Sequence, residues 1–145
     1  MTRYVAVVGP AEATDEEASI ARAVGSGLAR AGAIVVTGGR GGVMAAASQG
    51  AAESGGTTVG ILPGTSRDEA NDWVTIAIPT GLGELRNGLV VRAADAVIAV
   101  GGAYGTLSEI ALALKNGVPV IGLGTWDIDG VQGVPSPEEA VARAT

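Results

Sequence analysis

Two charged residues of this sequence, Arg86 and Glu109, are of a type and in a position that could serve chemistry. Arg86 lies in the first turn of a predicted helix, where a cation opposes the positive end of the helix dipole. An anionic ligand would explain this arginine, and so would a surface ion pair with Glu84 or another carboxylate. Glu109 is also open to two interpretations, because Thr106-Leu107-Ser108-Glu109 has the pattern of a helix capping box.

Glycine-rich segments follow several predicted strands and are candidates for phosphate binding. Free N–H groups at a helix N-terminus bind anions when small residues let the ligand approach. Glycine also makes tight turns without any ligand, but two such loops at one edge of a sheet favour a binding site. The candidate ligand-binding residues in these segments are Gly9, Gly38, Gly39, Arg40, Gly41, Gly101, Gly102, Ala103, Tyr104 and Gly105.

The composition excludes several classes of chemistry. The chain has no cysteine and no histidine, which removes thiolate catalysis, Ser-His-Asp triads and zinc sites built on these residues. Its single lysine, Lys115, lies near a predicted helix end, and no Walker motif is present, which argues against P-loop NTPases and pyridoxal phosphate enzymes. The net charge of −6 argues against general nucleic-acid binding.

The sequence also bounds the metal content and the location of the protein. Asp127-Ile128-Asp129-Gly130 hints at a calcium loop but lacks the remaining ligands, so we expect a turn and no metal site. No apolar run is long enough to span a membrane, and the first residues lack a signal-peptide pattern. We therefore expect a cytoplasmic protein that does not bind membranes.

Apolar runs and turn residues alternate along the chain in a regular way. Short apolar runs bounded by Gly and Pro predict strands over residues 4–8, 33–37, 57–62, 73–78, 96–100 and 118–123. Helical spacing and capping patterns predict helices from about 15 to 30, 43 to 53, 84 to 94 and 106 to 116, and a last short one after Ser136. This alternation predicts an α/β fold: one Rossmann-like, doubly wound domain over residues 1–145. Its mostly parallel sheet would have six or seven strands and helices on both faces.

Two motifs resemble those of the Lonely Guy (LOG) family. The segment Gly38-Gly39-Arg40-Gly41-Gly42-Val43-Met44 is similar to its GGG-x-x-GLM segment. The segment from Gly101 to Glu109 is similar to its P-G-G-x-G-T-x-x-E motif, and Val59-Gly60-Ile61-Leu62-Pro63 lies between the two. The resemblance covers nearly the whole chain and extends to the wider SLOG superfamily of Rossmann-like nucleotide binders, often mislabelled lysine decarboxylases.

The resemblance implies a function for these residues. LOG enzymes hydrolyse the N-glycosidic bond of nucleoside 5′-monophosphates, so the loop from Gly101 to Thr106 would hold the phosphate, and Arg86 and Glu109 would be catalytic. Gly101, Ala103 and Asn87 replace a proline, a glycine and a lysine of the family pattern. The stretch from Thr80 to Asn87 is closer to a divergent branch that includes molybdenum-cofactor carrier proteins.

Three hypotheses follow. The first is a LOG-like phosphoribohydrolase that needs no cofactor. The second is a non-catalytic carrier or sensor that holds a nucleotide, phosphate or the molybdenum cofactor, and the third is a structural oligomer with a vestigial site. The resemblance implies a homo-oligomer, a dimer or a tetramer, and the apolar helix over residues 43–52 suggests subunit contacts.

Overall fold

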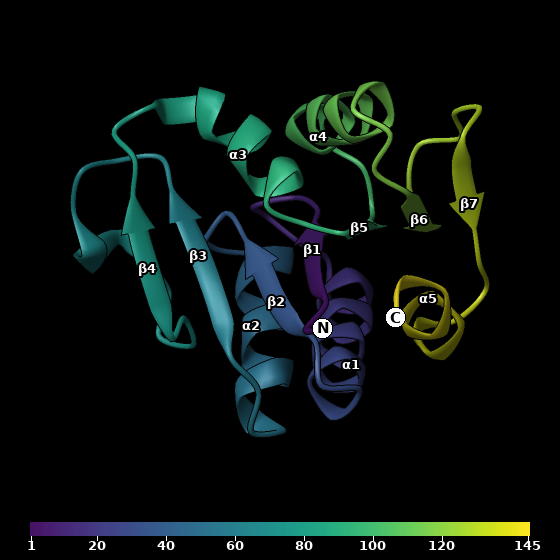
Figure 1. The fold of residues 1–145 in the computed structure, drawn as a ribbon, viewed down its shortest axis with the longest axis horizontal. Helices are drawn as coiled ribbons and strands as arrows, with labels where there is room; N and C mark the ends of the chain where they lie inside the picture. Colours follow the sequence, from purple (N-terminus) through teal and green to yellow (C-terminus); the bar gives the residue numbers. More distant parts are fainter.

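Strands and helices alternate along the chain in the computed structural model, which describes residues 1–145 (Figure 1). The strands are β1 (Tyr4–Val8), β2 (Ile34–Thr37), β3 (Thr58–Leu62), β4 (Ile76–Pro79), β5 (Ala96–Val100), β6 (Val120–Leu123) and β7 (Val131–Gly133). The α-helices are α1 (Asp15–Arg30), α2 (Val43–Glu53), α3 (Arg86–Arg92), α4 (Tyr104–Lys115) and α5 (Pro137–Ala144). Two short 3-10 helices, η1 (Arg67–Glu69) and η2 (Gly83–Leu85), lie on either side of β4.

All seven strands form one parallel sheet in the order β4-β3-β2-β1-β5-β6-β7. The central strand β1 pairs with β2 on one side and β5 on the other, so that Val5 lies opposite both Val35 and Ala96. The chain therefore builds the sheet outward from β1 to β4, returns to the centre, and builds outward again from β5. This arrangement confirms the predicted Rossmann-like α/β fold.

The start of β4 differs from the prediction, which placed a strand over residues 73–78. The hydroxyl of Thr58 donates to the carbonyl of Trp73, and the backbone N–H of Trp73 donates to the side chain of Asn71. Because side chains satisfy these backbone groups, residue 73 lies in a turn, and β4 begins only at Ile76.

The sheet is covered on both faces, as Figure 1 shows. Helices α1, α2 and α5 pack on one face, and α3 and α4 pack on the other. Valine and alanine fill both core layers, and every residue of β5 is buried. A strand buried on both faces has the continuous apolar sequence Ala96-Val97-Ile98-Ala99-Val100.

Helix α2 is buried within the protein, contrary to the expectation that its apolar residues make subunit contacts. It packs closely against α1, because a Cβ atom on Gly25 would lie only 1.9 Å from the carbonyl oxygen of Ala47. A Cβ atom on Gly50 of α2 would likewise lie only 2.0 Å from the carbonyl oxygen of Arg22. The small residues of α2 therefore serve the contact between two helices of the same chain.

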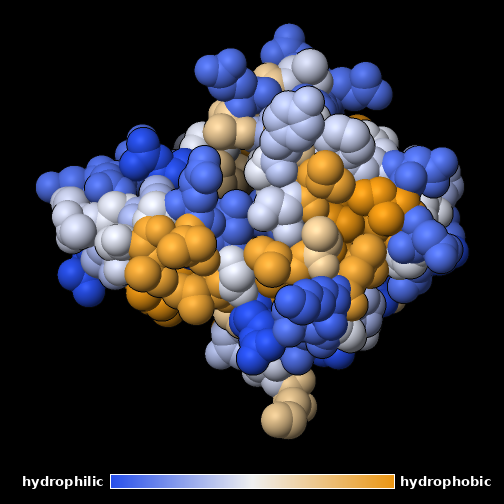
Figure 2. All heavy atoms as spheres, turned by 90° about the horizontal axis from the view of Figure 1, so that it is seen from above, coloured by the Kyte–Doolittle hydropathy of each residue, from blue (hydrophilic) through white to orange (hydrophobic).

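An exposed apolar area lies instead over the face of the molecule that carries α3 and α4, where Figure 2 shows orange side chains gathered. Leu82, Leu85 and Leu89, which we call the α3 patch, are 47%, 78% and 42% exposed. None of the helices combines the length and the apolarity that a transmembrane span requires.

Candidate functional site

A cleft of about 670 Å³ lies at the point where the sheet reverses its direction of growth, between the loops that follow β1 and β5. Ligands bind at this position in doubly wound sheets. Seven of the residues singled out from the sequence line it: Gly9, Arg86, Ala103, Tyr104, Gly105, Thr106 and Glu109. The structure therefore brings residues from three distant segments of the chain into one cavity.

Gly9 lets the two loops meet. A Cβ atom at this position would lie 2.4 Å from the carbonyl oxygen of Val100 and 2.7 Å from both methyl groups of Val43. On the other side of the junction, Gly101 has a φ of 68° and packs against the carboxylate of Glu17. A larger residue at Gly9 would collide with the backbone of β5, and a larger residue at Gly101 would be strained by the positive φ.

Helix α4 begins at Tyr104 rather than at the predicted Thr106. Ala103 is the extended residue that precedes the helix, and its carbonyl accepts the first helical hydrogen bond, from the N–H of Leu107. No side chain caps this end of the helix. The capping-box interpretation of Thr106 and Glu109 is therefore wrong, because both residues lie inside the helix.

The hydroxyl group of Thr106 has no hydrogen-bond partner although the residue is only 1% exposed. Thr106 lies in the first turn of α4 and lines the cleft. A buried hydroxyl without a partner is costly in a protein interior, and this one lies beside the free N–H groups of a helix end. Thr106 therefore combines a place in the lining of the cleft with a buried hydroxyl that no other part of the protein satisfies.

Glu109 lines the cleft one turn further along α4 and is 8% exposed. Burial raises the pKa of its carboxyl group from the ordinary 4.5 to about 8, and the positive charge of Arg86 opposes this rise. The side chain of Glu109 forms no ion pair. The carboxyl group therefore keeps its proton to a higher pH than an exposed glutamate does.

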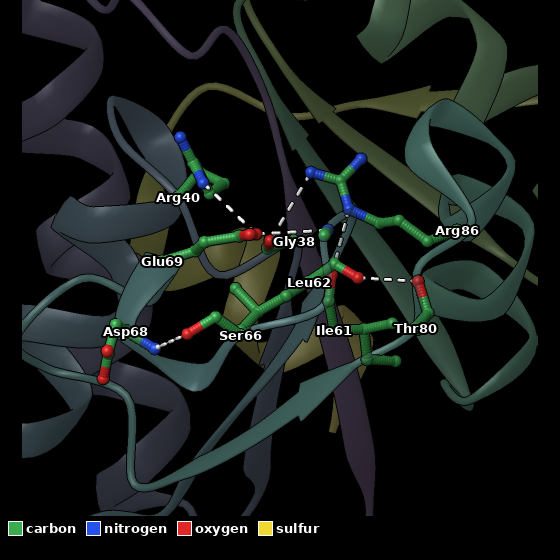
Figure 3. Close-up of polar contacts among 10 residues, drawn as sticks. Gly38, Arg40, Ile61, Leu62, Ser66, Asp68, Glu69, Thr80 and Arg86 are labelled. Carbon is green, nitrogen blue, oxygen red and sulfur yellow. Dashed lines mark hydrogen bonds and ion pairs between the residues drawn. The ribbon is translucent and has the colours of Figure 1, made fainter.

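Arg86 is fixed by the ends of two strands, as Figure 3 shows. Its Nε–H donates to the carbonyl of Ile61 at 2.9 Å, and a terminal nitrogen donates to the carbonyl of Gly38 at 3.4 Å. The other terminal nitrogen donates to the side chain of Asn87. Burial lowers the pKa of Arg86, although Glu109 opposes this effect. Arg86 forms no ion pair with Glu84, so the alternative interpretation from the sequence is not supported.

Arg40 lies outside the cleft lining, in a small cluster of its own (Figure 3). Its guanidinium group lies 3.5 Å from the carboxylate of Glu69, which also accepts a hydrogen bond from the backbone N–H of Gly64. The side chain of Asn71 donates to the carbonyl of Arg40. The positive charge of Arg40 nevertheless affects the site, because it helps to lower the pKa of Arg86.

The other glycines of the motifs shape the loops without lining the cleft. Gly38 supplies a carbonyl to Arg86, and Gly39 takes a φ of 78°. Gly41, Gly101 and Gly102 also lie outside the lining. Nine further residues, none of them predicted as a site residue, line the cleft: Pro10, Ala11, Met44, Glu84, Leu85, Asn87, Gly88, Ser108 and Leu112. Most of these are apolar or small, a type that no chemical motif distinguishes from core residues.

A further residue that the motifs did not indicate is Trp126, in the loop between β6 and β7. Its indole N–H donates to the carbonyl of Ala103 at 3.1 Å and so holds the residue that begins α4. No group of three or more acidic side chains converges to form a metal site.

Comparisons with known proteins agree with this architecture. The molybdenum cofactor binding protein of Rippkaea orientalis is 41% identical and has a TM-score of 0.94, and the match covers 99% of this chain and 95% of that one. The molybdenum cofactor carrier protein of Chlamydomonas reinhardtii is 38% identical with a TM-score of 0.90, over 99% and 96% of the two chains. The DNA processing protein A of Streptococcus pneumoniae, 21% identical with a TM-score of 0.80 over 99% of this chain and 62% of that one, shares the fold alone.

Sequence comparison points to the same group. An uncharacterised protein of Archaeoglobus fulgidus is 44% identical over 138 residues, which are 94% of this chain and 91% of that protein. The model of the SLOG cluster4 family matches residues 2–145. The chain therefore belongs to the SLOG cluster4 family.

Proposed function

We propose that this protein binds a phosphorylated heterocyclic ligand and, specifically, that it carries the molybdenum cofactor. The observation that supports this most directly is Thr106, a residue that lines the cleft and whose buried hydroxyl lacks a hydrogen-bond partner. A phosphate group at the N-terminus of α4 would accept a hydrogen bond from this hydroxyl and from the free N–H groups of the first turn. The helix dipole would add to the binding of the anion.

The residues of the cleft fit such a cargo. Its volume of about 670 Å³ lies within the range of pockets that hold small molecules. The chain has no histidine or cysteine, so neither an imidazole nor a thiolate of the protein would take up the molybdenum. The protein would hold the phosphate and the pterin ring, and the metal would stay with its own ligands. Such binding suits a carrier, because the cargo can leave without the breaking of a metal–protein bond.

Similarity to known carriers supports the same proposal. The proteins of Rippkaea orientalis and Chlamydomonas reinhardtii match this chain over almost their entire lengths. Both matches exceed 35% identity, well above the level at which only a fold is shared.

A second candidate function is the hydrolysis of nucleoside 5′-monophosphates, and the pair Arg86 and Glu109 favours it. Water would add to C1′ of the ribose while the bond to the base breaks, and the departing base would take up a proton. A carboxylate in such a site stabilises the positive charge that develops on the sugar. Glu109, with its pKa of about 8, would instead donate the proton to the base. The carrier ranks first because the molybdenum cofactor proteins of Rippkaea orientalis and Chlamydomonas reinhardtii are 41% and 38% identical to this chain.

One experiment separates the two functions. The purified protein is mixed with the molybdenum cofactor and passed through a desalting column, and molybdenum that co-elutes is measured by mass spectrometry. In parallel, the protein is incubated with AMP, GMP, CMP and UMP, and free base and ribose 5-phosphate are measured, with Glu109→Ala as the control. Co-elution of molybdenum without release of base supports the carrier. Release of base that disappears in Glu109→Ala, without retention of the cofactor, supports the hydrolase.

The remaining expectations concern partners. We infer that the ligand is a small molecule and that nucleic acids do not bind, because the net charge of −6 repels a phosphate backbone.

We also infer that the protein forms homo-oligomers and acts in the cytoplasm. The α3 patch is the surface that supports self-association best, because its three exposed leucines follow one another within residues 82–89.

A further inference from the structure

Tyr104 is the most exposed aromatic residue of the protein and lies at the edge of the cleft. It is 85% exposed and is the first residue of α4. The chain contains only two tyrosines, two tryptophans and no phenylalanine. The Tyr104 ring offers an exposed flat face of the kind on which a planar ligand can stack.

The ring of Tyr104 is supported from one side. It stacks with Trp126, with 6.3 Å between the ring centroids and an angle of 25° between the planes. The indole of Trp126 is itself fixed, because its N–H donates to the carbonyl of Ala103 and it packs against Gly102. Trp126 also packs against the core layer under α3 and α4. The two aromatic rings therefore form a braced pair that joins the loop after β5 to the loop after β6.

Only the tyrosine of this pair lines the cleft. Tyr104 is part of the cleft lining, whereas Trp126 lines a separate hollow between β6 and β7. One face of the Tyr104 ring is therefore turned toward the indole, and the residue itself borders the cleft. Thr106, whose hydroxyl lacks a partner, follows two residues later in the same turn of α4. One helical turn thus carries two residues that line the same cavity, an aromatic ring and a threonine whose hydroxyl lacks a partner.

We propose that Tyr104 is the stacking platform for the heterocyclic ring of the ligand, held in position by Trp126. This inference rests on the proposed function and deepens it. The first turn of α4 contacts both ends of a ligand that combines a planar ring with a phosphate. The phosphate binds at Thr106, and the ring stacks on the face of Tyr104 that Trp126 leaves open. Stacking on an aromatic side chain is tolerant of the ring's identity, so pterins and purines share this chemistry.

Calorimetric titration of three variants with three probes tests the platform. The probes are the molybdenum cofactor and GMP, which carry a ring, and inorganic phosphate, which does not. Tyr104→Ala is expected to weaken the binding of the ring-bearing probe by roughly five- to a hundredfold. It should leave the affinity for inorganic phosphate unchanged. Tyr104→Phe keeps the flat ring and should bind as the wild type does. Trp126→Phe, which removes the hydrogen bond to Ala103 but keeps an aromatic ring, should fall between the two.

The outcomes separate this inference from the function on which it rests. If the wild type binds a ring-bearing probe and Tyr104→Ala binds it equally well, the platform is wrong while the binding function stands. If Tyr104→Ala weakens inorganic phosphate as much as the ring-bearing probe, Tyr104 shapes the loop and does not stack, and the platform is again wrong. If the wild type binds none of the probes, the proposed function fails, and the platform fails with it. Loss of binding in Tyr104→Phe as well would assign the effect to the hydroxyl and overturn the stacking role.

Discussion

Glu109 and Arg86 line the same cleft from two different helices, yet they form no direct ion pair. Arg86 is held by carbonyl groups at the ends of β2 and β3, and this anchoring keeps its guanidinium group from closing on the carboxyl group. The two charges still interact, because each shifts the pKa of the other in the direction of the ionised form. Burial outweighs that attraction for Glu109.

The raised pKa of Glu109 predicts a specific dependence of stability on pH. From about pH 4.5 to about pH 8 the carboxyl group is ionised in the unfolded chain but still protonated in the folded protein. The folded state then binds one more proton than the unfolded state, so the free energy of unfolding falls as pH rises through this window, by at most about 1.4 kcal/mol per pH unit. Below about pH 4.5 Glu109 makes its full contribution to the free energy of unfolding. Above about pH 8 that free energy falls no further on account of Glu109. Glu109→Gln removes this slope.

Urea unfolding of the wild type and of Glu109→Gln at several pH values measures this effect. The free energy of unfolding of the variant, measured relative to that of the wild type, should rise steadily from about pH 4.5 to about pH 8 and stay constant above that pH. Parallel stability curves for the two proteins would show that Glu109 titrates normally. Glu69, which is also acidic but less buried, provides the matched control as Glu69→Gln.

Thr106→Val should separate binding from stability. Valine keeps the shape of the side chain and removes a buried hydroxyl without a partner, so we expect the free energy of unfolding to rise by roughly 1 kcal/mol. Binding of a phosphate-bearing ligand should fall roughly ten- to a hundredfold, because a hydrogen bond to a charged group is lost. Thermal unfolding and calorimetric titration measure the two quantities.

Ser48→Ala is the matched control for this prediction. Ser48 is also fully buried with a hydroxyl that lacks a partner, but it lies on α2, outside the cleft. Its replacement should stabilise the protein similarly and leave binding unchanged. Equal loss of binding in both variants would contradict the assignment of the Thr106 hydroxyl to the ligand.

Two glycine substitutions at the cleft should have opposite effects on stability. Gly9→Ala places a Cβ atom against a backbone carbonyl of β5 and should lower the free energy of unfolding by roughly 1–3 kcal/mol. Gly105→Ala meets no atom within 4 Å and lies inside α4, so it should stabilise the protein by about 0.5–1 kcal/mol. The added methyl group of Gly105→Ala lies at the cleft and should still hinder the ligand. A more stable protein with unchanged affinity would place the ligand away from Gly105.

The self-association of the protein stays a prediction, and Leu89→Glu tests it. A charge in the α3 patch should convert an oligomer into monomers, because the interface would have to bury an unpaired carboxylate. Ile76→Glu, at a residue of similar exposure on the edge strand β4, is the control. Sedimentation velocity gives the mass of each variant. A monomeric wild type would contradict the prediction, and dissociation by Ile76→Glu alone would move the interface to the sheet edge.

Much of the fold was predictable because apolar runs and turn residues mark each strand of this chain clearly. Thr14 and Glu17 form the predicted capping box at the start of α1, and Ser136 caps α5 as expected. The start of α4 was not predictable in the same way. The pattern Thr106-Leu107-Ser108-Glu109 satisfies the local rule for a cap, but the extended conformation of Ala103 begins the helix two residues earlier. Contacts made across the fold decided this boundary, among them the hydrogen bond from Trp126.

The candidate site shows the same division. Motifs pointed to Arg86, Glu109 and the segment from Ala103 to Thr106 as candidates, because their types and spacing carry chemical information, and all of these residues line the cleft. The position of Arg40 outside the cleft depends on its contact with Glu69, which lies 29 residues away along the chain. The pairing of Tyr104 with Trp126 likewise depends on how β6 follows α4 in space. Contacts of this kind leave no periodic or spacing signal.

The order of the strands has a mechanical consequence. Residues 4–79 build β1 to β4, residues 96–133 build β5 to β7, and within the sheet the two parts meet only along the pairing of β1 with β5. The cleft lies across this seam, with Gly9 on one side and the start of α4 on the other. A molecule bound there would contact both parts and would oppose their separation. Amide protons of β1 and β5 should then exchange with solvent more slowly when the cleft is filled, even though no atom of either strand's interior touches the ligand.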